Sequence, residues 1–324
     1  TNVTQFPVVF EAKKDAPLGG ALASLWGHGK HGDTPLSSKY THKVDWVRSN
    51  PVNTLYYETE LDELPVGVIE PLPFRLELEP PSSPLVRNGQ TSMKVVAHRS
   101  PGFTKPITVR WMWRPPGVSC NSTVTIPEGK NSANFNLSAN GNAELRTWKV
   151  CAQGESNGGK GVMFGSSDLV DLTVGESLVD MKMVMTTVKR GGKSEILIEV
   201  NDADGFEKDA KVSLVGMPPK TKTSPVTLSK GQKEIRFAIE AADDAPVGQH
   251  KNLFCQLEIP VDGKTVRQRS AFGGILRVDP KPKVVVASNQ KKPSSAPSSK
   301  APAKKSLSRL EQLRLEAKTA AGQP

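Results

Sequence analysis

The residues that most resemble metal ligands are His28, His31 and Asp33, with His42 close by in the sequence. Imidazole and carboxylate groups at this spacing are donors that zinc accepts. However, they stand among glycines in His28-Gly-Lys-His-Gly-Asp33, with no rigid element in view to hold them. A loop is the favoured interpretation, and a metal site is the alternative.

A second acidic group, Asp202-Ala-Asp204-Gly205, suggests a calcium loop. An EF-hand loop would require another acidic residue two positions upstream, where Val200 stands. The chain contains a similar stretch about one hundred residues earlier, Ser100-Pro-Gly102, which has no carboxylate. A turn is therefore favoured, and calcium at a junction between modules is the alternative; no other cofactor is expected.

Gly154-Glu-Ser156-Asn-Gly158 matches the spacing of a hydrolase nucleophile elbow. In that motif a strand-to-helix turn lifts the serine above a sheet. Here Gly159-Lys-Gly161 follows, which does not start a packed helix. The sequence favours a hairpin, and no P-loop, dinucleotide-binding glycine pattern or metalloprotease helix occurs elsewhere, so no catalytic residue is assigned.

The tryptophans offer a possible ligand platform. Trp111 and Trp113 share one face of an expected strand, and Trp148 follows. A sandwich core is the favoured role for these rings, and an exposed sugar-stacking surface is the alternative. Three cysteines are too few for a disulfide framework; a Cys120–Cys151 bridge is left open.

The positive charge belongs to the C-terminal part of the chain. The net charge is +10, and residues 281–324 hold ten Lys/Arg and two Glu, a net of +8, which leaves +2 for residues 1–280. A duplex-binding domain usually carries a basic patch on its folded surface, so no specific nucleic-acid partner is expected.

The sequence repeats itself at a spacing of about one hundred residues. Four landmarks keep the register, with offsets of 103, 102, 102 and 104: Pro115/Pro218, Gly129/Gly231, Phe135/Phe237 and Cys151/Cys255. Within each copy, short segments alternate apolar and polar residues, as in Met93-Lys-Val-Val-Ala and Glu195-Ile-Leu-Ile-Glu-Val. About seven such segments, separated by turn-forming residues, predict a β-sandwich.

A third, partial copy stands at the beginning of the chain. Phe10-Glu-Ala-Lys-Lys-Asp-Ala-Pro-Leu-Gly19 parallels Ile239-Glu-Ala-Ala-Asp-Asp-Ala-Pro-Val-Gly248. Because only the last part of a module is present, we expect a truncated module there. Residues 28–73 do not follow the repeat and are expected to form an insertion with additional strands.

These turn signatures carry a family resemblance. "PPGV", "VTIPEGK" and "DDAPVG" resemble the NEW3-like group of bacterial immunoglobulin-like modules, found in large secreted or surface proteins of planctomycete type. The first full copy departs from the pattern, with Asn142-Ala-Glu-Leu in place of the last motif. The resemblance implies an all-β fold of tandem immunoglobulin-like β-sandwiches, and its motifs say almost nothing about ligands.

The last part of the chain differs in composition. Lysine, proline, serine and alanine dominate residues 281–305, which predicts a disordered linker. Ser308-Arg-Leu-Glu311 is a capping-box pattern that predicts a short amphipathic helix over 306–319, either fraying alone or docking to a partner. We therefore expect a truncated module over 1–27, an insertion over 28–73 and two sandwiches over 74–175 and 176–280, followed by a linker over 281–305, a helix over 306–319 and a disordered end over 320–324.

The leading functional hypothesis is therefore non-catalytic: spacer or adhesion modules of a secreted or cell-surface bacterial protein, with a periplasmic location as the alternative compartment. The second hypothesis is a carbohydrate- or protein-binding accessory region of a larger secreted hydrolase, a protease or glycosidase, whose catalytic domain lies upstream. The weakest is an enzyme built on residues 28–73. No run of about eighteen apolar residues occurs, so no transmembrane segment is expected.

Overall fold

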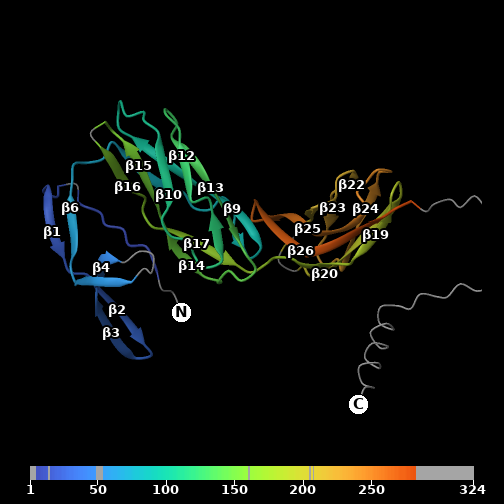
Figure 1. Ribbon diagram of the computed structural model, residues 1–324, viewed down its shortest axis with the longest axis horizontal. Coiled ribbons are helices and arrows are strands. Elements are labelled where there is room, and N and C mark those ends of the chain that lie inside the picture. Colours follow the sequence, from blue (N-terminus) through green and yellow to red (C-terminus); the bar gives the residue numbers. More distant parts are fainter. Residues whose placement is uncertain are drawn as a thin grey trace, which may run out of the picture. The chain divides into compact units, whose positions relative to one another are not determined.

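The protein is all-β, as a computed structural model shows, which confirms the predicted fold class (Figure 1). The structure describes residues 5–13, 15–48, 54–159, 161–203, 206 and 208–281. The predicted linker beyond Lys281 and the helix predicted over 306–319 lie outside the described residues. Among the residues that are described, no helix is long and apolar enough to cross a membrane.

The first immunoglobulin-like sandwich consists of two layers around one core. One sheet has the order β7 (Phe74–Leu78), β9 (Gly89–Arg99), β13 (Ser132–Ala139), β11 (Val118–Cys120). The other has the order β12 (Thr123–Ile126), β10 (Ile107–Trp111), β15 (Ala152–Asn157), β16 (Val162–Ser166). A short sheet of β14 (Thr147–Val150), β17 (Val170–Gly175) and β8 (Leu85–Val86) accompanies them. Phe135 is fully buried between the layers, because alternate residues of each strand face inward.

The second sandwich repeats this arrangement. One sheet has the order β18 (Asp180–Met183), β20 (Lys193–Asp202), β24 (Glu234–Ala241), β22 (Thr221–Thr223). The other has the order β23 (Val226–Leu228), β21 (Ala210–Val215), β25 (Gly248–Val261), β26 (Lys264–Asp279), β19 (Thr186–Lys189). Phe237, the counterpart of Phe135 in the sequence repeat, is fully buried here.

The repeat extends to individual backbone contacts. In each sandwich a short early strand runs parallel to the last one, β8 beside β17 and β19 beside β26. The arginine after each early strand donates from Nε to a carbonyl: Arg87 to Ala143 at 2.8 Å and Arg190 to Ala245 at 2.6 Å. The two copies therefore share this parallel strand pair and this arginine–carbonyl hydrogen bond as well as their strand pattern.

Three strand pairs precede the first sandwich. They are β1 (Gly19–Ala23) with β6 (Leu64–Val68), β2 (Trp26–His31) with β3 (Thr34–Lys39), and β4 (His42–Arg48) with β5 (Leu55–Leu61). No described residue before Phe74 belongs to a buried core, and large side chains such as Leu22 (65% exposed) and Trp26 (57% exposed) face outward. The strands of this region are formed, whereas a packed core begins only with β7.

Candidate functional site at the junction of the two sandwiches

Backbone pairing joins the two sandwiches edge to edge. Strand β26 of the second sandwich runs antiparallel to the beginning of β9 of the first, with Arg267 opposite Gln90 and Gln268 opposite Gly89. The Arg269 N–H donates to the Asn88 carbonyl at 2.8 Å. One sheet of each sandwich thus continues into the other, and we call this contact the seam.

The side chain of Gln268 fixes the connecting segment to the seam. It is only 1% exposed. Its Oε1 accepts from the backbone N–H groups of Leu178 and Val179 at 2.8 and 3.3 Å, and its Nε2 donates to the Val179 carbonyl at 2.5 Å. The one amide therefore pairs with three backbone groups of the connecting segment, two N–H groups and one carbonyl. Such groups would be costly to bury without a partner.

Neighbouring contacts hold the same segment. The Met181 N–H donates to Ser270 Oγ at 2.9 Å, and Ser177 Oγ donates to the Arg87 carbonyl at 3.1 Å. Val86, from the first sandwich, packs into the core cluster of the second. The junction is therefore a hydrogen-bonded and partly apolar interface, unlike a solvated linker.

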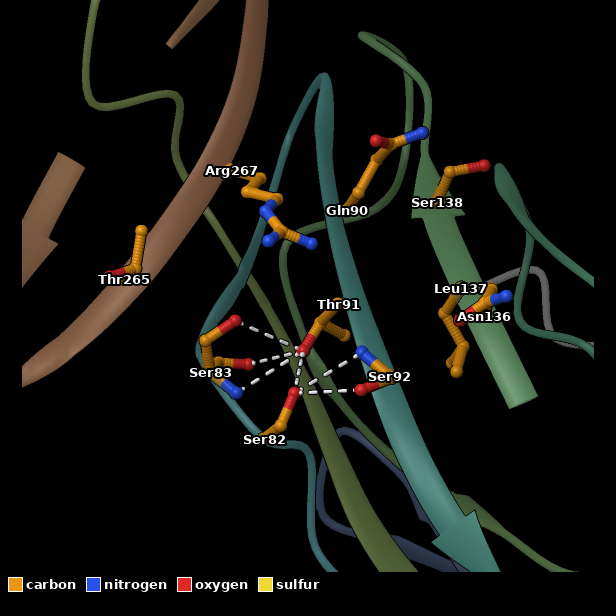
Figure 2. Close-up of a pocket in the computed structure, with 10 residues that line it drawn as sticks. All are labelled: Ser82, Ser83, Gln90, Thr91, Ser92, Asn136, Leu137, Ser138, Thr265 and Arg267. Carbon is orange, nitrogen blue, oxygen red and sulfur yellow. Dashed lines mark hydrogen bonds between the residues drawn. The ribbon is translucent and has the colours of Figure 1, made fainter. Parts of the chain in front are cut away.

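A polar cavity of about 590 Å³ lies beside the seam (Figure 2). Its lining is rich in hydroxyl and amide groups and comes from both sandwiches: Ser82, Ser83, Gln90, Thr91, Ser92, Asn136, Leu137, Ser138, Thr265 and Arg267. Figure 2 shows Arg267 extending from β26 toward β9. The cavity exists in this form because the seam brings β26 next to β9.

Most hydroxyl groups on one wall of the cavity bond to one another. Thr91 Oγ1 donates to the Ser83 carbonyl at 2.8 Å and lies 3.1 Å from Ser83 Oγ. Ser82 Oγ lies 3.0 Å from Ser92 Oγ. The guanidinium of Arg267 is 3.9 Å from the Glu258 carboxylate and remains exposed. The cavity therefore presents a neutral hydroxyl wall opposite one cation, which suits a polar ligand such as a sugar.

The predicted histidine group is spread over a hairpin. His28 and His31 lie in β2 and Asp33 in the turn that follows. Residues three apart in a strand point to opposite faces, so the two imidazoles do not converge. In the part of the chain that the structure describes, no three His, Cys, Asp or Glu side chains gather as metal ligands would.

Of the other two candidate cation ligands, the structure describes Asp202 only. Asp202 ends β20 opposite Asp180 of β18, and Asp180 accepts a hydrogen bond from Asn201 at 2.9 Å. Asp204 lies outside the described residues. The calcium alternative stays a prediction.

Ser156 lies in the hairpin β15–β16 and not on a strand-to-helix turn. The side chain is buried, and its Oγ donates to the Pro106 carbonyl at 2.8 Å. A serine held in this way is a structural hydrogen-bond donor.

The tryptophans are packed to different degrees. Trp111 is 8% exposed and meets Phe135 edge to face, with ring centroids 5.1 Å apart. Trp113 is half-buried and tilted against Trp148 at 5.6 Å, while Arg146 lies 5.0 Å from the Trp148 ring. Trp111 thus offers no stacking face, and Trp113 offers part of one.

All three cysteines are free thiols, including the pair Cys120 and Cys151. Burial raises the pKa of each, and that of Cys255 to about 12.

Reasoning from the sequence missed Gln268 and the hydroxyl-rich cavity. One signal was present: Gln268 and Ser270 follow Val266 at alternate positions, so they occupy the inward phase of an apolar strand. A polar side chain on that face needs a buried partner, but the sequence does not say which.

No family model and no curated protein matches the chain. Three solved structures illustrate the structural similarity: a protein of unknown function from Porphyromonas gingivalis W83, the D0-D1 domain of intimin, and a chimeric titin Z1Z2-Z1Z2 tandem functionalised with a GRGDS peptide from fibronectin. Identities are 12%, 7% and 12%, and TM-scores are 0.24, 0.22 and 0.20. Each match covers 63% of this chain and 99%, 97% and 96% of the other. Because these TM-scores are low, nothing about this chain is inferred from the three structures. The fold is assigned as immunoglobulin-like from the strand pairing of the two sandwiches.

Proposed function

We propose that the chain is a non-catalytic spacer or adhesion unit, made of two immunoglobulin-like modules over residues 74–175 and 176–280. The module bounds follow the sequence repeat, and residues 1–27 and 28–73 are the end of a further module and an insertion. In this role the modules hold neighbouring parts of a larger protein at a fixed distance and orientation.

The seam is the observation that supports this function. Modules joined by a solvated linker reorient freely, whereas a sheet that continues across the junction resists bending and rotation. The amide of Gln268 ties the connecting segment to the same sheet, through three contacts with Leu178 and Val179. A stiff pair of modules is what a spacer requires.

The resemblance to NEW3-like modules supports a secreted or cell-surface bacterial protein of planctomycete type as the parent. Extracellular exposure fits free thiols that are buried or partly buried, because such thiols react slowly with oxidants. The linker and the helix that the sequence predicts over 281–305 and 306–319 would then connect the array to a partner.

Residual dipolar couplings of backbone amides in the full chain test the stiffness. For the native protein we expect couplings from both modules to fit one alignment tensor, because the two bodies tumble together. The Gln268→Ala variant removes the amide and should lower the free energy of unfolding by about 2–4 kcal/mol, since it leaves buried backbone groups unpaired.

The matched control is Gln232→Ala, which removes an exposed amide that bonds only within its own turn. This variant should keep the single tensor, whereas Gln268→Ala should give two tensors of different magnitude. Two separate tensors in the native protein would contradict the spacer proposal.

The cavity beside the seam favours a second function, a carbohydrate-binding accessory region of a larger secreted hydrolase. Its hydroxyl and amide lining, with Arg267 on one side, is chemically suited to a sugar. Titration of the full chain with a panel of soluble polysaccharides should then shift amide signals around Asn136, and Asn136→Ala should weaken binding about tenfold. Binding that instead depends on Trp113→Ala would place the ligand at the tryptophans, and no binding at all would leave only the spacer.

A further inference from the structure

The beginning of β20 repeats the edge on which β26 docks in the first sandwich. A two-residue turn precedes each strand, and its second residue has a positive φ in both: 58° at Asn88 and 67° at Gly191. The next residue is a glycine in a tight approach. A Cβ on Gly89 would lie 2.7 Å from the Val86 carbonyl oxygen, and one on Gly192 would lie 3.0 Å from that of Lys189.

The backbone groups of this edge point the same way in both copies. Ala241 N–H donates to the Gly192 carbonyl, so Gly192 faces β24. Alternation along the strand then turns the N–H and C=O of Lys193 to the other side. The Gly191 N–H donates to the Ala242 carbonyl at 3.3 Å, so only the carbonyl of Gly191 can take part in this edge. Their counterparts, Asn88 and Gln90, face β26 in the seam.

On that side of β20, in the described part of the chain, the Leu197 carbonyl accepts from the Val184 N–H at 3.1 Å, and the pairing with β18 follows from Ile198. The Lys193 side chain is exposed, and its N–H and C=O belong to an open sheet edge. Such an edge is a template for another strand.

The hairpin β2–β3 lies mostly in the proposed insertion, but its turn and strand pairing match the tip of β25–β26. Gly19 pairs with Val68 as Gly248 pairs with Val278, each after the repeated Asp-Ala-Pro motif. Two residues form each turn, since the closing pairs are His31–Thr34 and Val261–Lys264. Counting from these turns, residues 37–39 occupy the positions of 267–269, the residues that form the seam.

The outer edge of β3 is also open. Tyr40 N–H donates to the Leu25 carbonyl at 2.8 Å, so alternation turns the backbone of Ser37 and Lys39 away from β2. Among the described strands, β3 pairs only with β2. Pro35 lacks an N–H, but its counterpart Thr265 lies beyond the two residue pairs of the seam.

We propose that two copies of this chain associate head to tail, with β3 of one copy added to β20 of the next. Ser37 would lie opposite Lys193 and Ser38 opposite Gly192, and the Lys39 N–H would donate to the Gly191 carbonyl. The second copy is the occupant because each chain carries both halves of a contact that already exists once within it. An interface of this heterologous kind joins molecules into open chains, unless the rotation between successive copies closes them into a ring.

The contact should be weaker than the seam. Ser38 stands where Gln268 reaches the connecting segment, and a serine side chain is too short for those bonds. The covalent connection that raises the local concentration within the chain is also missing between copies. We therefore expect a dissociation constant of about 0.1–1 mM.

Sedimentation velocity of the full chain, from about 10 µM to about 1 mM, tests the proposal. The native weight-average mass should rise with concentration. Lys193→Pro removes the outward N–H and leaves the hydrogen bonds between β20 and β24 in place. Proline is tolerated at such an edge position, because the N–H that it lacks has no partner within the sheet. This variant should associate at least tenfold more weakly, as should Ser37→Pro.

Matched controls keep the backbone donor. Lys193→Ala loses the same ion pair with Glu240 as the proline variant, and Ser37→Ala loses the same hydroxyl; both should associate as the native chain does. An equimolar mixture of Lys193→Pro and Ser37→Pro should stop at dimers, because each variant retains one intact edge. A native chain that stays monomeric at every concentration would overturn the proposal, as would association that both proline variants retain or that the alanine variants lose equally.

Discussion

At the scale of single residues, three side chains that could take part in chemistry or ligand stacking are buried: Ser156, Trp111 and Cys255. Ser156 donates to a backbone carbonyl, and Trp111 packs on Phe135. Cys255 lies fully buried in the second core, where loss of solvation disfavours the thiolate and raises its pKa to about 12. Gln268 pairs through its backbone with Gly89 of the first sandwich, and its side chain holds the connecting segment at Leu178 and Val179.

The raised pKa of Cys255 predicts a loss of stability in alkali. An unfolded thiol ionises near its ordinary pKa of about 8.5, whereas the folded one stays protonated to about 12. The stabilisation is therefore complete below about pH 8.5 and is lost as the pH rises toward 12, at about 1.4 kcal/mol per pH unit. From pH 8 to pH 10 the free energy of unfolding should fall about 1–2 kcal/mol further in the native chain than in Cys255→Ala.

Urea unfolding followed by far-ultraviolet circular dichroism at both pH values measures this difference. Tyrosine and lysine ionisation is common to both proteins and cancels in the comparison. Equal losses of stability in the native chain and the variant would show that the Cys255 thiol does not contribute.

At the scale of elements, the alternating segments predict the strands well. The expected strand in Met93–Ala97 lies within β9, and the stretch that starts at Glu195 lies within β20. Local pattern carries this information because one face of each strand is buried. The seam could not be predicted, since it joins Gly89 to Gln268 across the sequence through backbone groups that every residue has. The same holds for the cavity, whose walls come from separate strands.

The hairpin β15–β16 offers a test of why glycine occurs at position 154. A Cβ there would lie 2.7 Å from Leu76 Cδ1 and 3.0 Å from Ile107 Cγ2, both in the core. Gly154→Ala should therefore overpack the first sandwich and lower its free energy of unfolding by about 1–3 kcal/mol. Tryptophan fluorescence reports this unfolding, because Trp111 and Trp148 are buried in that core.

Gly29→Ala is the control, since no atom lies within 4 Å of a Cβ at Gly29. Its effect on the unfolding of the first sandwich should be negligible. A Gly154→Ala variant as stable as this control would mean that close packing does not require the glycine of the Gly-Glu-Ser motif.

At the scale of the whole molecule, most of the net positive charge lies in the C-terminal part of the sequence and little of it in the modules. Residues 1–280 carry a net charge of about +2, and the strand pairing between sandwiches uses backbone groups, so the seam should depend little on ionic strength. We propose that this seam holds the two modules in one orientation, as a spacer requires.

The most direct measurement of that claim is the distribution of distances between the modules. Spin labels on Lys149→Cys and Lys222→Cys, at exposed positions of the two sandwiches, with Cys120→Ser to remove the least buried thiol, report it by double electron–electron resonance. A single narrow distribution is predicted for the otherwise native chain, broadening when Gln268→Ala is added. A broad distribution before that substitution would contradict the claim that the seam fixes the modules.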